Sequence, residues 1–234
     1  MPLLEVDRIN SYYGDSHILF DVSMVVRERE VVALLGRNGA GKSTTLKSLM
    51  GVVQPRSGTI RLRGEPVEHL APFELARRGV QLVPEDRRVF GQLSVHENLQ
   101  LAAMTAEEPL SLDAVYHTFP RLAERKRNRG KQLSGGEQQM VAIARAMIRN
   151  AGLIMLDEPF EGLAPLIVRD LIEVCRHLAE QGHTIIIVEQ NVRAALSLAH
   201  RCYIINNGHM VFEGTPVQLQ GDQSTIEKYL GVKV

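Results

Sequence analysis

The stretch that decides the fold is VVALLGRNGAGKST, residues 31–44. It begins with an apolar run, continues into a glycine-rich loop and ends in GKST. Such a run is typical of a strand buried on both faces of a parallel sheet. Residues 36–43 fit the pattern G-x-x-x-x-G-K-[ST], a loop that binds phosphates between a strand and a helix. The stretch therefore predicts a strand, a phosphate-binding loop and a helix that begins near Lys42.

The residue types in this loop suit phosphate chemistry. Glycines let backbone N–H groups close around phosphate oxygens. The amine of Lys42 can reach the β- and γ-phosphates, and the hydroxyl of Ser43 can bind Mg²⁺. The residues expected to contact the nucleotide here are Gly36, Arg37, Asn38, Gly39, Ala40, Gly41, Lys42, Ser43 and Thr44.

A second stretch, LIMLDEP at residues 153–159, has the form of a core strand that ends in two acids. Ligands of open α/β sheets bind at the carboxyl ends of the strands, where Asp157 and Glu158 would emerge. Asp157 is expected to hold Mg²⁺, directly or through water, and Glu158 to polarise the attacking water. Two acids are common at ordinary strand ends, but behind a phosphate loop they predict a catalytic role.

The rest of the chain alternates between strand-like and helix-like segments. Strands are expected at 3–9, 18–26, 57–64 and 80–83, and a helix at 71–78. The segment from about residue 86 to 150 is mostly helical, and strands and helices alternate again after it. Residues 202–214 predict a hairpin around an Asn-Gly turn. We therefore predict an α/β fold, an open sheet with a helical insertion.

The insertion ends in LSGGEQQMVAIARAMI, residues 133–148, which predicts a helix with an exposed anion site at its start. Ser134 and Glu137 have capping-box spacing. The two glycines between them have no side chains, so the backbone of the first helical turn is accessible. Free N–H groups and the helix dipole favour an anion there. We infer that this second site serves another ATPase chain, facing head to tail. The residues expected to cover the partner's nucleotide are Leu133, Ser134, Gly135, Gly136 and Glu137.

Together these motifs resemble the ATP-binding subunit of ABC transporters over nearly the whole chain. The phosphate loop, LSGGE and LIMLDEP follow the family's order, and Tyr13 stands where an aromatic residue stacks on adenine. The resemblance implies one domain over residues 1–234: a RecA-like P-loop NTPase core with an N-terminal antiparallel β subdomain (1–85 and 151–234) and an inserted helical subdomain (86–150). It also implies ATP and Mg²⁺ as ligands, a nucleotide-sandwich dimer and Mg-dependent ATP hydrolysis coupled to membrane permease subunits.

Within the family, VPEDRRVF, LSVHENLQLAA, EPFEGLAP and IVEQN are similar to the type for branched-chain amino-acid uptake, or to its relatives for urea and short amides. That type implies a heterodimer with a related ATPase, with a homodimer as the alternative, and an indirect link to a solute-binding protein. It implies a peripheral position on the cytoplasmic face of the inner or plasma membrane. Arg87 and Arg88 either line the groove for the transporter's coupling helix or are simply exposed.

Four positions depart from the commoner family pattern. Glu85 stands where most members have a Gln that senses Mg²⁺, and Gln190 where most have a His on the γ-phosphate; Ala164 replaces an Asp and Glu137 a Gln. A carboxylate is a good ligand for a hard cation, so Mg²⁺ could still bind at Glu85. Gln190 can donate a hydrogen bond but carries no charge, so it is a weaker phosphate partner than an imidazolium. We expect secure ATP binding and slower hydrolysis at this chain's own site.

The composition of the chain disfavours several other classes of protein. The 234 residues are 44% hydrophobic with a formal net charge of zero, so no overall field attracts nucleic acid. The two cysteines have no metal or disulfide spacing and fit a reducing cytosol. Apolar runs fall far short of the ~18 residues of a membrane span. The rivals are a low-turnover regulatory module, an ABC ATPase of repair or translation, and a P-loop kinase. LSGGE disfavours the kinase, and Glu158 disfavours a pure binder.

Overall fold

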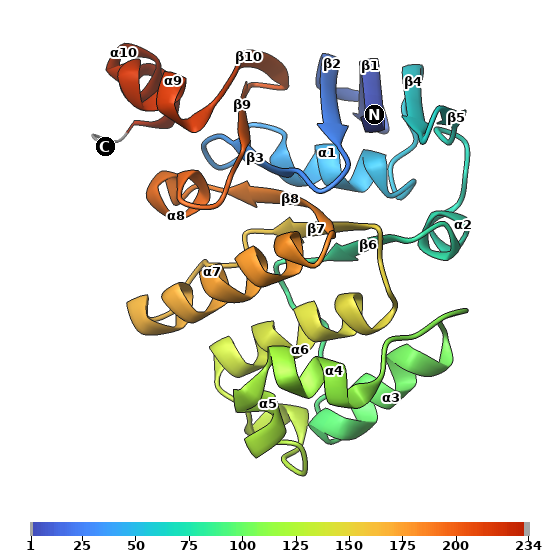
Figure 1. The fold of residues 1–234 in the computed structure, drawn as a ribbon. Helices are drawn as coiled ribbons and strands as arrows, with labels where there is room; N and C mark the ends of the chain where they lie inside the picture. Colours follow the sequence, from blue (N-terminus) through green and yellow to red (C-terminus); the bar gives the residue numbers. More distant parts are fainter. Residues whose placement is uncertain (1, 232–234) are drawn as a thin grey trace.

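Two β-sheets and a group of helices make up the fold (Figure 1). The computed structural model describes residues 2–231. A four-stranded antiparallel sheet has the order β2-β1-β4-β5, and a six-stranded sheet has the order β10-β9-β3-β8-β7-β6, parallel except at β10. The predicted α/β class with an antiparallel β part is confirmed. The strands are β1 (Pro2–Tyr13), β2 (Ser16–Arg27), β3 (Val31–Leu35), β4 (Ser57–Leu62), β5 (Glu65–Pro66), β6 (Val80–Val83), β7 (Leu153–Asp157), β8 (Thr184–Glu189), β9 (Arg201–Asn206) and β10 (His209–Gly214).

The helices connect these strands and form the insertion. The helices expected near Lys42, over 71–78 and within 133–148 appear as α1, α2 (72–77) and α6. They are α1 (Lys42–Leu49), α2 (Pro72–Arg77), α3 (Val95–Met104), α4 (Leu112–Thr118), α5 (Pro120–Glu124), a 3₁₀ turn η1 (Gly130–Gln132), α6 (Gly135–Ile148), α7 (Pro165–Glu180), α8 (Val192–Leu196), α9 (Pro216–Gly221), α10 (Gln223–Thr225) and a π-helical turn η2 (Ile226–Leu230).

The central strands β3, β7 and β8 are buried along their whole length, as their apolar runs predict. Successive side chains of a strand point to opposite faces of the sheet. Leu153 and Met155 of β7 therefore join the core shared with α1 and the antiparallel sheet, whereas Ile154 and Leu156 join the core shared with α6 and α7. The six-stranded sheet thus has apolar layers on both faces.

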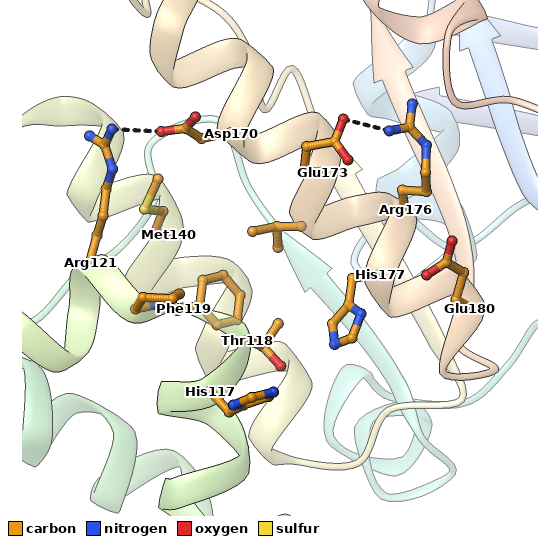
Figure 2. A pocket seen from close by; sticks show the side chains of 12 residues that line it. His117, Thr118, Phe119, Arg121, Met140, Asp170, Glu173, Arg176, His177 and Glu180 are labelled. Carbon is orange, nitrogen blue, oxygen red and sulfur yellow. Dashed lines mark hydrogen bonds and ion pairs between the residues drawn. The ribbon is translucent and has the colours of Figure 1, made fainter.

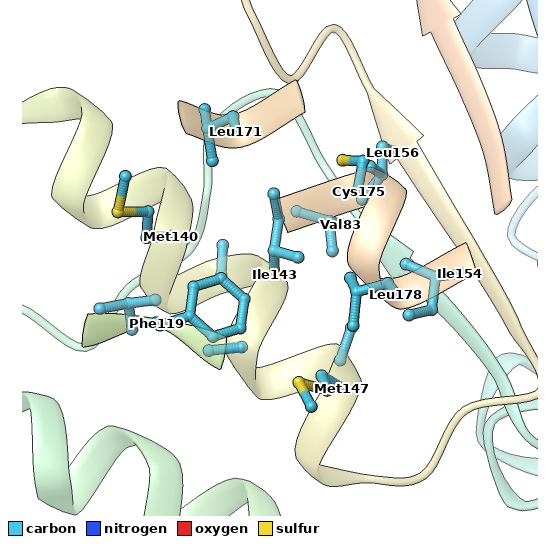
Figure 3. Close-up of a cluster of buried hydrophobic side chains, with 14 of the residues drawn as sticks. Val83, Phe119, Met140, Ile143, Met147, Ile154, Leu156, Leu171, Cys175 and Leu178 are labelled. Atoms are coloured by element: carbon cyan, nitrogen blue, oxygen red, sulfur yellow. The ribbon is translucent and has the colours of Figure 1, made fainter. Parts of the chain in front are cut away.

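The contact between α6 and α7 fixes the insertion to the sheet. In Figure 3, Ile143 and Met147 of α6 lie opposite Leu178 of α7, with strand residues behind them. At the start of α6 the two helices come so close that a β-carbon on Gly136 would collide with Cγ2 of Ile167. Only glycine therefore fits at the second position of the glycine pair in LSGGE without displacing the side chain of Ile167.

The insertion, coloured green to yellow in Figure 1, holds α3 to α6. The predicted capping box of Ser134 and Glu137 begins α6, and a second capping box, of Ser94 and Glu97, begins α3. The buried side chain of Asn98 accepts a hydrogen bond from the N–H of Phe90 (3.0 Å) and donates one to its carbonyl (3.1 Å). The segment between β6 and α3 is therefore fixed to the helices.

The predicted Asn-Gly hairpin joins β9 to β10 and supports the phosphate loop. Asn207 and Gly208 both have positive φ (46° and 78°), as a two-residue hairpin turn requires. The N–H of Gly208 donates to the carbonyl of Ala40 at 2.8 Å, while its carbonyl accepts from Phe20 of β2 at 2.9 Å. The turn thus connects the antiparallel sheet to the loop after β3.

The contact between α6 and α7 gives a stability prediction. Truncating the fully buried Ile143 to Ala leaves a cavity between α6, α7 and the sheet, and should lower the free energy of unfolding by about 3 kcal/mol. Met104→Ala, at a side chain that is 82% exposed, is the control and should change it by less than about 0.5 kcal/mol. Urea unfolding of both variants measures the difference, and equal midpoints would show that this contact does not hold the fold together.

Candidate functional site

Three parallel strands end side by side and bring the predicted residues together. β8 lies between β3 and β7, with Leu35 beside Glu189 and Asp157 beside Val188. The loops that follow these strands therefore begin at one edge of the sheet. The sequence places the phosphate loop after β3, the acidic pair at the end of β7 and Gln190 after β8. The fold converts three distant motifs into one site.

The phosphate loop occupies residues 36–41, between β3 and α1. Gly39 and Gly41 have φ values of 76° and 114°, in a backbone region that residues other than glycine rarely adopt. Gly41 caps α1 without any side-chain hydrogen bond, so the N–H groups of the first helical turn stay free for an anion. Lys42 is the first residue of this helix, and its Nζ donates to the carbonyl of Arg37 at 3.1 Å.

Side chains from the three strand ends form a connected polar network. The Oγ of Ser43 donates to Oδ1 of Asp157 at 2.9 Å. The Nζ of Lys42 lies 3.1 Å from Oε1 of Glu158, and these two side chains are only 4% and 8% exposed. The other carboxylate oxygen of Glu158 accepts a hydrogen bond from Nε2 of Gln190 at 2.8 Å. Glu158 is thus held between the lysine of the phosphate loop and the amide after β8.

Asp157 has a pKa above its ordinary value. Burial is the main cause, and the negative charges of Glu158 and Glu85 add to it. The hydrogen bond from Ser43 acts in the opposite direction but does not outweigh them. A divalent cation beside Asp157 would offset this unfavourable concentration of negative charge.

Glu158 has a pKa below its ordinary value, in contrast to its neighbour. Burial alone would raise that pKa, but hydrogen bonds with Gln190, Glu161 and Lys42 outweigh burial. The pKa of Glu161 is raised, first by its hydrogen bond to Glu158 and then by burial. Of these two carboxyls, Glu158 therefore loses its proton at the lower pH, as a general base at neutral pH must.

Glu189 is a site residue that the sequence analysis did not identify. It is 2% exposed, and its carboxylate accepts backbone hydrogen bonds from Phe160 (2.9 Å), Gln190 and Asn191 (3.1 Å each). It joins the loop after β7 to the loop after β8 and so sets the spacing of the network. The signal available in the sequence was a charged residue at the end of an apolar strand, in IVEQN.

Of the remaining predicted residues, only Glu85 lies close to this network. Glu85 is an exposed residue in the loop after β6, close enough for its charge to affect Asp157. Tyr13 ends β1 with 45% of its surface exposed. At the start of α6, Ser134 and Glu137 bond each other's backbone N–H at 3.3 and 2.8 Å. Among residues 2–231 no hydrogen bond or ion pair joins residues 133–137 to the phosphate loop.

A groove of about 590 Å³ lies between the core and the insertion. Its lining is basic and partly apolar and includes Arg87 and Arg88, although the side chain of Arg88 is largely exposed. The groove extends to Asp157. It is also lined by Lys47 of α1, Leu101 of α3, Arg145 of α6, Arg149 directly after α6, and Phe90 in the loop before α3.

A second cavity, of about 600 Å³, lies between α4, α5 and α7, away from the predicted residues (Figure 2). An ion pair between Arg121 and Asp170 (2.7 Å) crosses from the insertion to α7 at its rim. Phe119 and Met140 contribute apolar surface. None of the predicted nucleotide, metal or signature residues lines it.

Comparison with known proteins gives a consistent result. Residues 19–161 match the profile of a family described as ABC transporter. The chain is 42% identical to the high-affinity branched-chain amino acid transport ATP-binding protein BraG of Pseudomonas aeruginosa, covering 98% of this chain and 100% of that protein. It is 35% identical to the lipopolysaccharide export system ATP-binding protein LptB of Escherichia coli K12, covering 99% and 98%.

Solved structures give the same fold. An ATP-binding cassette of an ABC transporter in its ADP conformation superposes with a TM-score of 0.87 at 24% identity, covering 99% of this chain and 98% of that one. An ATP-binding subunit of an ABC transporter superposes with a TM-score of 0.81 at 32% identity, covering 94% and 92%. Within residues 2–231, no helix has the length and apolar character needed to span a membrane.

The position of Glu189 gives a test of how the site is built. Replacing Glu189 by Gln puts an amide donor where backbone donors now meet carboxylate oxygens, and should lower the free energy of unfolding by roughly 1–3 kcal/mol. Glu107→Gln, at an exposed loop position, is the control and should be neutral. Urea unfolding checks both, and a Glu189→Gln protein as stable as its control would mean that the carboxylate does not brace the two loops.

Proposed function

This chain belongs to the ABC transporter family, and we propose that it is the ATP-hydrolysing subunit of an importer for branched-chain amino acids. It is an ABC ATPase by family and by fold. The observation that carries the proposal is the meeting of Lys42, Ser43, Asp157, Glu158 and Gln190 where β3, β7 and β8 end. The similarity to BraG, and the motifs typical of that type, support branched-chain amino acids over lipopolysaccharide, which the name of LptB specifies.

ATP would bind with its phosphates in the loop of residues 36–44. The free N–H groups at the start of α1 and the amine of Lys42 would hold the β- and γ-phosphates. Tyr13, exposed at the end of β1, is the residue for the adenine ring. The oxygen donors of Ser43, Asp157 and Glu85 fit Mg²⁺.

Before hydrolysis, Lys42 would release Glu158 and bind the γ-phosphate instead. The γ-phosphate competes with Glu158 for the buried amine, since both are anions. Once released, the Glu158 carboxylate can accept a proton from the attacking water, while Gln190 donates to it and keeps it in position. Gln190 adds no charge to the γ-phosphate, so we expect this chain's own site to turn over slowly.

The groove at residues 87–88 is the proposed contact for the membrane permease. Nε atoms of Arg145 and Arg149 are buried there without a hydrogen-bond partner among the described residues, and Phe90 and Leu101 expose apolar surface. A cytoplasmic permease segment could place acidic side chains against these arginines and apolar side chains against Phe90 and Leu101. Docking of this kind would keep the chain at the cytoplasmic face of the membrane. We propose no nucleic-acid partner.

The start of α6 is the proposed contact with a second ATPase. The start of α6, with Leu133 to Glu137, would cover ATP held by a related ATPase facing head to tail, most simply as a heterodimer. We retain the division into a core (1–85 and 151–234) and a helical subdomain (86–150). A low-turnover regulatory module is the second candidate, because Gln190 is neutral and Lys42 already has an anionic partner.

Lys42→Ala tests the transport role. Loss of the amine removes the charge on the β- and γ-phosphates, so the variant should not restore uptake of labelled leucine to a host that lacks the gene, whereas wild type and the exposed control Lys126→Ala should. Normal leucine uptake in the deletion host, with uptake of urea or short amides lost instead, would move the assignment to the alternative solutes.

Glu158→Gln tests the role of the base. The amide can still hydrogen-bond but cannot accept the proton of water, so ATP binding should persist while hydrolysis falls at least a hundredfold. The variant should therefore stay paired with its partner ATPase in ATP and Mg²⁺, as gel filtration would show. A Glu158→Gln complex that hydrolyses ATP at the wild-type rate would rule out this residue as the base.

A further inference from the structure

The cavity of about 600 Å³ between α4, α5 and α7 shares no lining residue with the permease groove or the proposed nucleotide site. Cavities of this size are typical of binding sites for small organic molecules. Its walls come from both parts of the fold (Figure 2): the junction of α4 and α5 and Met140 of α6 belong to the insertion, and α7 belongs to the core. A molecule bound here would therefore touch the insertion and the core at once.

The apolar part of the lining consists mainly of Val174, Phe119 and Met140. Val174 is half-buried, whereas Phe119 and Met140 present only their edges to the cavity because the rest of each side chain is packed in the core. Phenylalanine rings and methionine sulfur atoms both make favourable contacts with aromatic rings. This part of the cavity therefore suits a ligand with an aromatic body.

One face of α7 supplies all the carboxylates of the lining. Asp170, Glu173, His177 and Glu180 follow one another at intervals of three or four residues, so they lie on the same side of the helix. The opposite side of α7 carries the buried Leu171 and packs into the core. The polar face of α7 is thus turned toward the cavity.

The charges of this lining do not balance. Asp170 pairs with Arg121 across the cavity at 2.7 Å, and Glu173 pairs with Arg176 on α7 itself. Both arginines of the lining are therefore engaged. Glu180 makes no ion pair or side-chain hydrogen bond within residues 2–231. Three carboxylates against two arginines leave a negative charge without a counterion, which favours a cationic ligand.

Two histidines add hydrogen-bonding groups near this charge. His177 is one turn from Glu180 on α7, and Figure 2 shows His117 on the same side of the cavity, away from the pair of Arg121 and Asp170. The ring of His177 is hydrogen-bonded to the amide of Gln181 at 2.9 Å. His117 has no hydrogen bond or ion pair among the residues that the structure describes. A free imidazole nitrogen can accept a hydrogen bond from an ammonium group.

We propose that this cavity binds an aromatic amine, a compact ring system that carries one ammonium group. The ring would lie against Val174 and the edges of Phe119 and Met140, and the ammonium would face Glu180 and His117. The class of ligand follows from the apolar wall on one side and the uncompensated carboxylate on the other.

A bound amine would strengthen the contact between the insertion and α7. The ion pair of Arg121 and Asp170 bridges the cavity, but its side chains are 43% and 27% exposed, and ion pairs this accessible to water contribute little. A ligand that touches α5, α6 and α7 together binds this arrangement better than one in which the insertion has moved away from α7. Its binding would therefore favour the present arrangement of the two parts.

Three indole probes of similar size test the proposed charge preference. Tryptamine is a cation, tryptophol is neutral and indole-3-acetate is an anion. Saturation-transfer difference NMR on the purified chain measures their dissociation constants, which for molecules this small are expected on the order of 1 mM. Tryptamine should bind about three- to fivefold more tightly than tryptophol, and indole-3-acetate should bind most weakly.

Two variants locate the site. Val174→Trp fills the cavity and should abolish tryptamine binding, whereas its control Leu166→Trp, at an exposed position of the same helix, should keep it. Glu180→Gln should weaken tryptamine about three- to fivefold and leave tryptophol unchanged, because only tryptamine carries a charge. Glu107→Gln, an exposed position outside the cavity, is its control and should change neither.

The proposal is overturned if the wild-type chain binds none of the probes, or if tryptamine binds Val174→Trp as well as wild type. Equal affinities for tryptamine and tryptophol would contradict the preference for a cation. Should Val174→Trp fail to fold, Glu180→Gln decides, since its side chain is exposed and bonds no other described residue. Because the readout is binding rather than ATP hydrolysis, a negative result would leave the proposed function standing.

Discussion

The buried ion pair between Lys42 and Glu158 is the contact on which the site depends. Its atoms lie 3.1 Å apart and both side chains are almost fully buried. A buried cation that loses its counterion is strongly destabilising, so release of Glu158 from Lys42 is favoured when another anion takes its place. In an ABC ATPase that anion is phosphate. In the mechanism that we propose, this ion pair would couple the arrival of ATP to the release of Glu158 as the base.

The rest of the fold holds the parts of this exchange at fixed distances. Glu189 joins the loops after β7 and β8, and the hairpin turn at Gly208 supports the phosphate loop. On the far side of the sheet, the packing of α6 on α7 sets where the start of α6 points. The groove at Arg87 and Arg88 adjoins both this helix and Asp157. A partner bound there would touch both Asp157 and α6, which carry the proposed metal ligand and the proposed second anion site.

The sequence predicts the fold class and the position of the main site because both depend on local patterns. The apolar runs of β3, β7 and β8 are typical of buried strands. In a parallel sheet, the glycine loop, Asp157 and Glu158 then meet at the carboxyl ends of these strands. The loop-bracing role of Glu189 was not predictable, since its three backbone donors come from two separate loops. Nor was the contact between Arg87 and Gly135, because it depends on a positive φ and on how the insertion packs. Contacts between loops that are far apart in the sequence cannot be predicted from any local sequence pattern.

The most direct measurement is a cryo-EM structure of the assembled transporter trapped with ADP, Mg²⁺ and vanadate. Our account predicts that Nζ of Lys42 contacts the vanadate and no longer Glu158, that Glu158 and Gln190 face the position of the attacking water, and that residues 133–137 of this chain touch the vanadate held by the opposing ATPase. An intact ion pair between Lys42 and Glu158 beside the trapped nucleotide, or vanadate contacted by residues 133–137 of the chain that binds it, would contradict the account.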